Sequence, residues 1–172
     1  MNFCQSKHIS NNYYEPFIGG DAVYFAINNA KHYFINDKSK DLVDLDKKIK
    51  YISGRDIQDR LQKTTIENAD FYDFMKSKNT TENDFIFLDP PYDTEFSTYD
   101  KNEFTQNDQK RLANFLINET NCKWQLVIKN TDFIYGLYDK KGINIKYFDK
   151  SYNVSFMNRN DRKTEHLLIT NY

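Results

Sequence analysis

The sequence has few cysteines and no long apolar run. Its two cysteines, Cys4 and Cys122, lie far apart among 172 residues and form no Cys-x-x-Cys pair. They imply no disulfide framework and no zinc site, and they are typical of reduced thiols. No apolar run approaches the length of a membrane span, and none near the start resembles a signal segment. We therefore expect a single cytoplasmic domain over residues 1–172 with no membrane contact.

The sequence also lacks a strong charge of either sign. A formal net charge of −1 creates no overall field that would attract a polyanion, so a nucleic-acid partner would need a local basic patch. Aromatic residues are plentiful at 16% and consist almost entirely of Phe and Tyr. They indicate either a core of large flat side chains or a surface that stacks on bases, and composition does not choose between these.

Short apolar runs alternate with helical patterns, which is typical of an α/β domain with a largely parallel sheet. We expect strands at 12–17, 32–36, 64–69, 85–88, 124–128, 143–148 and 166–170. We expect helices at 22–30, 41–52, 56–62, 71–76, 106–117 and 132–138. Thr105 is the expected N-cap of the helix at 106–117, with Asp108 near the capping-box position.

The segment Asp89-Pro90-Pro91-Tyr92 directly follows the most apolar expected strand, 85–88. Ligands of open α/β sheets bind beyond the carboxyl ends of the strands, where this segment must lie. Two prolines fix the backbone and remove two N–H donors, so a carboxylate beside rigid carbonyls forms a clamp suited to an amino group. Tyr92 adds a flat face for a base. The alternative is a simple strand-terminating turn.

This segment resembles the acidic-Pro-Pro-aromatic motif of the Dam-type (DPPY-motif) adenine-specific DNA methyltransferases. The likeness covers about residues 13–37 and 66–172 and includes four further segments. Two of these segments lie in the second half of the chain. One runs from Phe104 through Asp108-Gln109 to Leu116, and the other from Arg162-Lys163-Thr164-Glu165 to Asn171-Tyr172. The remaining matches fall on the cofactor-binding positions of the family. They are a loop with Glu15, Pro16, Phe17, Gly19 and Gly20, the single acid Asp37, and the pair Asp70-Phe71.

The resemblance implies a doubly wound, mostly parallel, Rossmann-like sheet with an antiparallel final strand. It implies S-adenosylmethionine as cofactor, with Asp37 on the ribose hydroxyls, Asp70-Phe71 beside the adenine, and Asp89 shared between cofactor and target. Read alone, each position has a simpler interpretation. Gly19-Gly20 is then a tight turn, Asp37 a cap before Ser39, and Asp70 the N-cap of the next helix.

The resemblance also implies a mechanism on DNA. The target adenine is flipped out of the duplex and stacks on Tyr92. Its amino group donates hydrogen bonds to the Asp89 carboxylate and the Pro90 carbonyl, and the methyl group is transferred directly. Neither a metal nor a covalent enzyme intermediate is needed. Tyr99 is either a second aromatic near the flipped base or an exposed loop residue.

Three departures from the family pattern leave alternatives open. Asp21 replaces the last glycine of the cofactor loop, where it either crowds the cofactor or caps the helix that starts at Ala22. Lys7 lies in a segment that resembles the N-terminal cofactor motif of the family, with Gln5 in place of a glycine, and is either a contact for the cofactor carboxylate or a free surface lysine. Residues 38–69 form a reduced helical segment where relatives carry a target-recognition domain. The cluster of Arg159, Arg162 and Lys163 either holds phosphates or forms a solvated loop.

Two other functions therefore stand beside adenine methylation of DNA. One is amino-group methylation of cytosine or RNA, because the same clamp suits any such amine. The other is a silent relative that binds nucleic acid or a partner subunit. A restriction-modification partner or a separate specificity subunit is also left open.

Overall fold

The computed structural model describes residues 11–19, 22–27, 29–40, 44, 55–92, 104–150 and 164–172. In this part of the chain the strands are β1 (Asn12–Glu15), β2 (His32–Asn36), β3 (Thr64–Glu67), β4 (Phe85–Leu88), β5 (Lys123–Lys129), β6 (Asn144–Lys150) and β7 (Thr164–Thr170). The helices are α1 (Ala22–Ala26), α3 (Arg55–Gln62), α4 (Phe71–Lys76), α5 (Gln106–Asn114), the π-helical turn η1 (Phe115–Glu119) and α6 (Asp132–Tyr138). The helix expected at 41–52 lies outside the described residues, apart from Asp44, which is helical.

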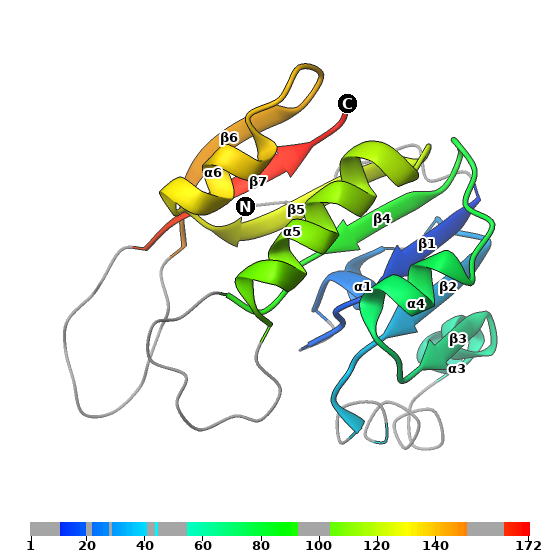
Figure 1. Cartoon of the computed structure of the whole chain (residues 1–172). Helices are drawn as coiled ribbons and strands as arrows, with labels where there is room; N and C mark the ends of the chain where they lie inside the picture. Colours follow the sequence, from blue (N-terminus) through cyan, green and yellow to red (C-terminus); the bar gives the residue numbers. More distant parts are fainter. Residues whose placement is uncertain are drawn as a thin grey trace, which may run out of the picture.

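The strands form one sheet with the order β3-β2-β1-β4-β5-β7-β6 (Figure 1). β1 pairs in parallel with both β2 and β4, and the pairs β2–β3 and β4–β5 are also parallel. β7 lies between β5 and β6 and is antiparallel to both. The expected mostly parallel α/β sheet with an antiparallel final strand is confirmed.

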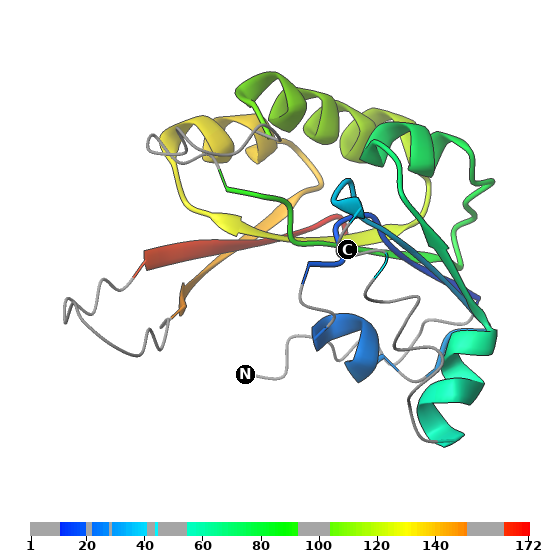
Figure 2. The same cartoon turned by 90° about the horizontal axis from the view of Figure 1, so that it is seen from below.

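Helices cover both faces of the sheet. Figure 2 shows α4, α5 and α6 on one face and α1 and α3 on the other. In β4, Ile86 and Leu88 pack with the first layer of helices, whereas Phe85 and Phe87 pack with the second. An uninterrupted apolar run is what a strand buried on both faces requires. Within the described residues, no helix combines the length and the apolar character needed to cross a bilayer.

Two strands end earlier than their apolar patterns predict. β1 ends at Glu15, because Pro16 has no backbone N–H with which to continue the ladder. β3 ends at Glu67, and two residues later the Ala69 N–H donates to the side chain of Asn36 at 2.9 Å. A contact between distant segments therefore sets the end of β3.

The first helix is also shorter than predicted. α1 ends at Ala26, and Ala30 lies outside it. The Tyr33 hydroxyl donates to the Ile27 carbonyl at 3.2 Å. This carbonyl is thereby satisfied by a side chain from β2 and needs no further helical turn.

The beginning of α5 matches the prediction, but its end does not. Thr105 Oγ1 accepts from the Asp108 N–H at 3.3 Å, and Asp108 Oδ2 accepts from the Thr105 N–H at 3.0 Å, which confirms the capping box. Regular α-helix stops at Asn114, and a wider π-helical turn follows. Within this turn the Leu116 carbonyl accepts from the Trp124 indole N–H at 2.9 Å.

Candidate active site

The site residues singled out from the sequence follow the carboxyl ends of neighbouring parallel strands. Gly19 comes after β1, Asp37 after β2, Asp70 after β3, and Asp89 directly after β4. Because parallel strands end at the same edge of a sheet, the fold brings these residues to one edge. This edge is where open α/β sheets bind their ligands.

The loop after β1 closes onto the residue that follows β2. Glu15 is buried and accepts a hydrogen bond from the Tyr13 hydroxyl at 2.6 Å. Gly19 has a φ of 48°, a left-handed conformation that favours glycine. Its N–H donates to Asp37 Oδ2 at 3.3 Å. The turn predicted at Gly19 is therefore present, and its backbone is tied to Asp37.

Asn36 joins the loops that follow β1 and β3. Its side chain is only 1% exposed. Nδ2 donates to the Pro16 carbonyl at 3.1 Å and to the Ala69 carbonyl at 3.0 Å, while Oδ1 accepts from the Ala69 N–H. One buried amide thus satisfies three backbone groups that have no strand partner, and it fixes the spacing of the two loops.

Asp37 makes the local cap and also contacts the glycine loop. Its Oδ1 accepts from the Ser39 N–H at 2.7 Å, while Oδ2 accepts from Gly19. Each carboxylate oxygen can accept two hydrogen bonds, so both oxygens retain capacity for hydroxyl donors. The simple interpretation of Asp37 as a cap therefore does not exclude ligand binding.

Three phenylalanine rings from separate segments of the chain pack together. The Phe17 centroid lies 5.4 Å from that of Phe71 and 5.3 Å from that of Phe104, and the Phe71 and Phe104 centroids are 5.6 Å apart. Phe71 is buried, whereas the other two are partly exposed at the edge of the core. The cluster joins the loop after β1 to the residue that precedes the N-cap of α5.

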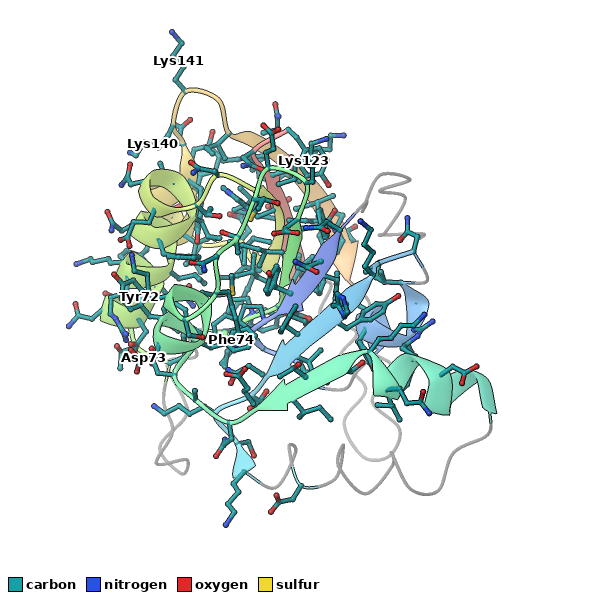
Figure 3. All side chains as sticks on the ribbon, turned by 90° about the vertical axis from the view of Figure 1, so that its right-hand side faces the viewer. Tyr72, Asp73, Phe74, Lys123, Lys140 and Lys141 are labelled. Atoms are coloured by element: carbon teal, nitrogen blue, oxygen red, sulfur yellow. The ribbon has the colours of Figure 1, made fainter. Side chains whose placement is uncertain are left out.

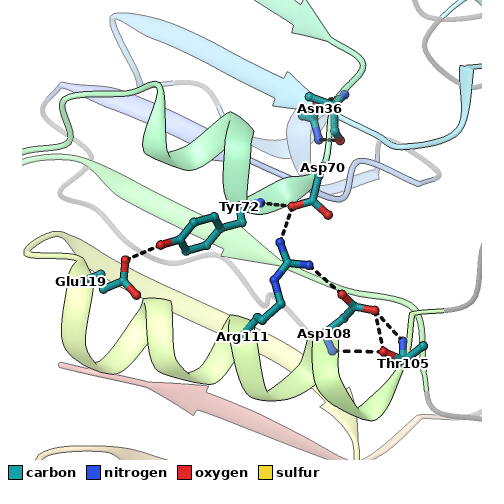
Figure 4. Close-up of polar contacts among 8 residues, drawn as sticks. Asn36, Asp70, Tyr72, Thr105, Asp108, Arg111 and Glu119 are labelled. Atoms are coloured by element: carbon teal, nitrogen blue, oxygen red, sulfur yellow. Dashed lines mark hydrogen bonds and ion pairs between the residues drawn. The ribbon is translucent and has the colours of Figure 1, made fainter.

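Asp70 is the N-cap of α4 and is also part of an ion-pair network. Its Oδ1 accepts from the Tyr72 N–H and from Arg111, both at 2.9 Å (Figure 4). Arg111 also donates to Asp108 Oδ1 at 2.8 Å. Burial opposes the charge of Arg111, but its hydrogen bonds to Asp70 and Asp108 raise its pKa overall. Burial also opposes the charge of Asp108, yet hydrogen bonds from Thr105 and Arg111 lower its pKa.

Asp89 and Tyr92 contact each other across the double proline. The half-buried Asp89 accepts at Oδ1 from the Tyr92 hydroxyl at 3.1 Å. The Tyr92 ring meets the buried ring of His166 on β7 edge to face, with centroids 5.3 Å apart. Both contacts restrict the rotation of Tyr92 and so orient the segment that follows β4.

Gln109 holds the second carbonyl of the same segment. It is fully buried, and its Nε2 donates to the Pro91 carbonyl at 3.2 Å. Among the described residues its amide oxygen has no hydrogen-bond partner. The two proline carbonyls are therefore not equivalent, because that of Pro91 is engaged by α5.

Sequence reasoning assigned no role to four residues that organise this edge, namely Asn36, Gln109, Arg111 and His166. A polar residue at the end of an otherwise apolar strand was the available signal for Asn36. The spacing of Asp108 and Arg111 by three residues was the signal for their ion pair. Nothing in the sequence signals the contact of His166, because it joins segments far apart in the chain.

Several predicted site residues lie outside the described residues. They are Lys7, Gly20, Asp21, Tyr99, Arg159, Arg162 and Lys163. Within the described ranges, no group of three or more His, Cys, Asp or Glu side chains is arranged to hold a metal ion.

Comparison with known proteins identifies related sequences. The model of the D12 class N6 adenine-specific DNA methyltransferase family matches residues 4–59 and 50–154. The chain is 34% identical over 113 residues to type II methyltransferase M.CviBI of Paramecium bursaria Chlorella virus NC1A, a match that covers 64% of this chain and 42% of the relative. It is 28% identical over 107 residues to modification methylase StsI of Streptococcus sanguinis, covering 55% of this chain and 16% of the relative. The matched region is thus less than half of either relative.

Solved structures agree with this fold. The delta-N METTL16 MTase domain superposes with a TM-score of 0.59 at 10% identity, covering 99% of this chain and 77% of that domain. At this identity the likeness shows the fold alone, which is the Rossmann-like methyltransferase fold.

We predict that Asn36→Leu lowers the free energy of unfolding by about 2–4 kcal/mol, because buried backbone groups lose their partner. Urea denaturation measures this change. The matched control is Asn118→Leu, an exposed asparagine on η1, for which we expect a change within about 0.5 kcal/mol. Equal effects of the two substitutions would contradict the linking role of Asn36.

Asp108 predicts a pH dependence of stability. The pKa of this carboxyl is lowered on folding from an ordinary value of 3.8, so its contribution is fully present above that value and is lost as the pH falls through the lower folded pKa. We expect the difference in urea midpoint between wild type and Asp108→Asn to be constant from neutral pH to about pH 5 and to shrink towards about pH 2. A difference that does not change with pH would refute this assignment.

Proposed function

The chain belongs to the D12 class N6 adenine-specific DNA methyltransferase family, and on this premise we propose that it transfers a methyl group from S-adenosylmethionine to the N6 amino group of adenine in DNA. The observation that carries the proposal is the position of Asp89-Pro90-Pro91-Tyr92. This segment directly follows the central strand β4, at the same sheet edge as Asp37 and Asp70. An amino-group clamp and carboxylates suited to a nucleoside therefore follow strands that end at the same edge of the sheet.

The residues at this edge fit the chemistry of S-adenosylmethionine. Asp37 retains acceptor capacity on both oxygens for the two ribose hydroxyls, and Gly19 allows the backbone to approach a ligand closely. Asp70 offers an acceptor for the adenine amino group, and the partly exposed Phe17, which packs on the buried Phe71, offers apolar surface for the ring. The cofactor, when bound, supplies an activated methyl group on its sulfonium. Lys7, Glu15, Pro16 and Gly20 complete the proposed cofactor set.

Asp89 and Pro90 act on the target base in this proposal. The amino group of a flipped adenine donates to the Asp89 carboxylate and to the Pro90 carbonyl, which returns electron density to a nitrogen whose lone pair is otherwise delocalised. Tyr92 provides the stacking surface, while its hydroxyl holds Asp89 Oδ1. The Pro91 carbonyl is held by Gln109, which supports Pro90 as the second acceptor.

We propose that residues 38–69 alone are not sufficient to recognise a DNA target sequence. The family model matches the chain in two pieces that overlap at residues 50–59, inside the segment for which the resemblance implies a target-recognition domain in relatives. A discontinuous match there is expected if this region is reduced. We propose that DNA is the substrate. A specificity subunit or a restriction-modification partner would then supply the further contacts with DNA.

A catalytically silent relative is the second candidate. Asp21 favours it, because a charged side chain replaces the glycine expected in the cofactor loop. Cofactor binding separates the two candidates, since a silent relative needs no pocket for S-adenosylmethionine.

Calorimetric titration of S-adenosylmethionine is the first test. We expect a dissociation constant of about micromolar order, with binding lost in Asp37→Ala. Asp73→Ala is the matched control, because Asp73 lies on the outer side of α4, away from the sheet (Figure 3). No binding of wild type at about 1 mM ligand would exclude an enzyme that works without a partner.

Asp89→Ala tests the clamp. We predict a loss of methyl transfer to DNA of at least about a hundredfold with thermal stability retained, because the amino group loses its charged acceptor. Transfer of labelled methyl from S-adenosylmethionine to adenine-containing duplexes measures this loss. Undiminished transfer in Asp89→Ala would show that the Asp-Pro-Pro-Tyr segment does not act on the substrate.

A further inference from the structure

Arg111 connects Asp70 to the first turn of α5. One guanidinium nitrogen lies 2.9 Å from Asp70 Oδ1, and the other lies 2.8 Å from Asp108 Oδ1 (Figure 4). The guanidinium carbon also lies 5.2 Å from the ring centroid of Phe71 and 5.6 Å from that of Tyr72. Two carboxylates and two aromatic faces therefore restrict a side chain that is ordinarily mobile.

The two described hydrogen bonds of Asp70 fall on the same oxygen. Oδ1 accepts from the Tyr72 N–H and from Arg111, and these bonds occupy its two lone pairs. Within the described part of the chain, Oδ2 has no hydrogen bond, and Figure 4 shows it turned away from Arg111. Either carboxylate oxygen of Asp70 could cap α4 by accepting from the Tyr72 N–H. The hydrogen bond from Arg111 therefore determines that Oδ1 is the oxygen that caps the helix.

Arg111 is in turn held by the capping box. Asp108 Oδ2 accepts from the N–H and from the hydroxyl of Thr105, while Oδ1 accepts from Arg111. The relay from Thr105 through Asp108 and Arg111 to Asp70 is thus anchored on the backbone at the start of α5. A rotation of the Asp70 carboxylate would break this relay at Arg111.

We propose that Arg111 is a positioning residue, which commits Asp70 Oδ1 and leaves Oδ2 to accept a hydrogen bond from the 6-amino group of the cofactor's adenine. This role rests on the proposed function. It makes Arg111 a determinant of cofactor specificity, because a fixed carboxylate oxygen accepts from an amino group and repels the carbonyl of a 6-oxopurine.

A purely structural role would resemble that of Glu119. Glu119 also joins α4 to the helix that follows, accepting from the Tyr72 hydroxyl at 3.0 Å and from Lys76 at 3.3 Å. It does not contact Asp70. Glu119→Gln is therefore a matched control, which removes an ion pair between α4 and η1, the turn that continues α5, and does not remove a partner of the Asp70 carboxylate.

Binding of S-adenosylhomocysteine and of its 6-oxo analogue S-inosylhomocysteine tests the role. We expect wild type to prefer the adenine ligand by about thirtyfold, as for a hydrogen bond to a charged acceptor. Arg111→Met should reduce this preference to below about fivefold, whereas Glu119→Gln should keep it within about twofold of wild type. In an Asp70→Asn background, Arg111→Met should cause no further change in preference.

Thermal unfolding of each variant separates specificity from stability. If Arg111→Met fails to fold, Arg111→Lys keeps the charge but cannot bridge both carboxylates, and it should lower the preference partway. An unchanged preference in a folded Arg111 variant, with both ligands weakened equally, would overturn the positioning role while the proposed function stands. Failure of wild type to bind either ligand would overturn the proposed function and the positioning role together.

Discussion

Parallel pairing of β1 with β2 and β4 is the constraint on which the site depends. Each strand must leave the sheet at the same edge, so the loops after them converge with backbone groups that have no ladder partner. The Asn36 side chain bonds the backbone of Pro16 and Ala69, and the Asp37 carboxylate accepts from the Gly19 N–H. The side chains that complete the hydrogen bonding of the sheet thus also set the spacing of its loops. The geometry of the site is a consequence of how the sheet ends.

Features that depend on neighbouring residues could be predicted from the sequence, and those that depend on distant residues could not. The apolar run of β4 and the capping box of Thr105 and Asp108 are local, and both match the structure. The end of β3 depends on the contact between Ala69 and Asn36, which lie 33 residues apart. Periodicity contains no information about such a contact, and neither does it reveal the pairing of Arg111 with Asp70.

The candidate site shows why a single acid is hard to interpret from sequence. For Asp70, helix capping and ligand binding looked like alternatives, but a carboxylate has two oxygens and can do both. Oδ1 caps α4 and pairs with Arg111, which leaves Oδ2 for another donor. Asp37 divides its oxygens between Ser39 and Gly19 in a similar way. Capping therefore orients these carboxylates and does not compete with the binding that we propose.

The aromatic content bears on how DNA would be held. The composition left open whether the rings form a core or a stacking surface, and most described rings either are buried in the two hydrophobic clusters on either side of the sheet or pack against them. Tyr147 and Tyr172 are the large apolar side chains that are clearly exposed in the described ranges. The formal net charge of −1 creates no overall field that attracts a polyanion, so binding of DNA would depend on a local basic patch.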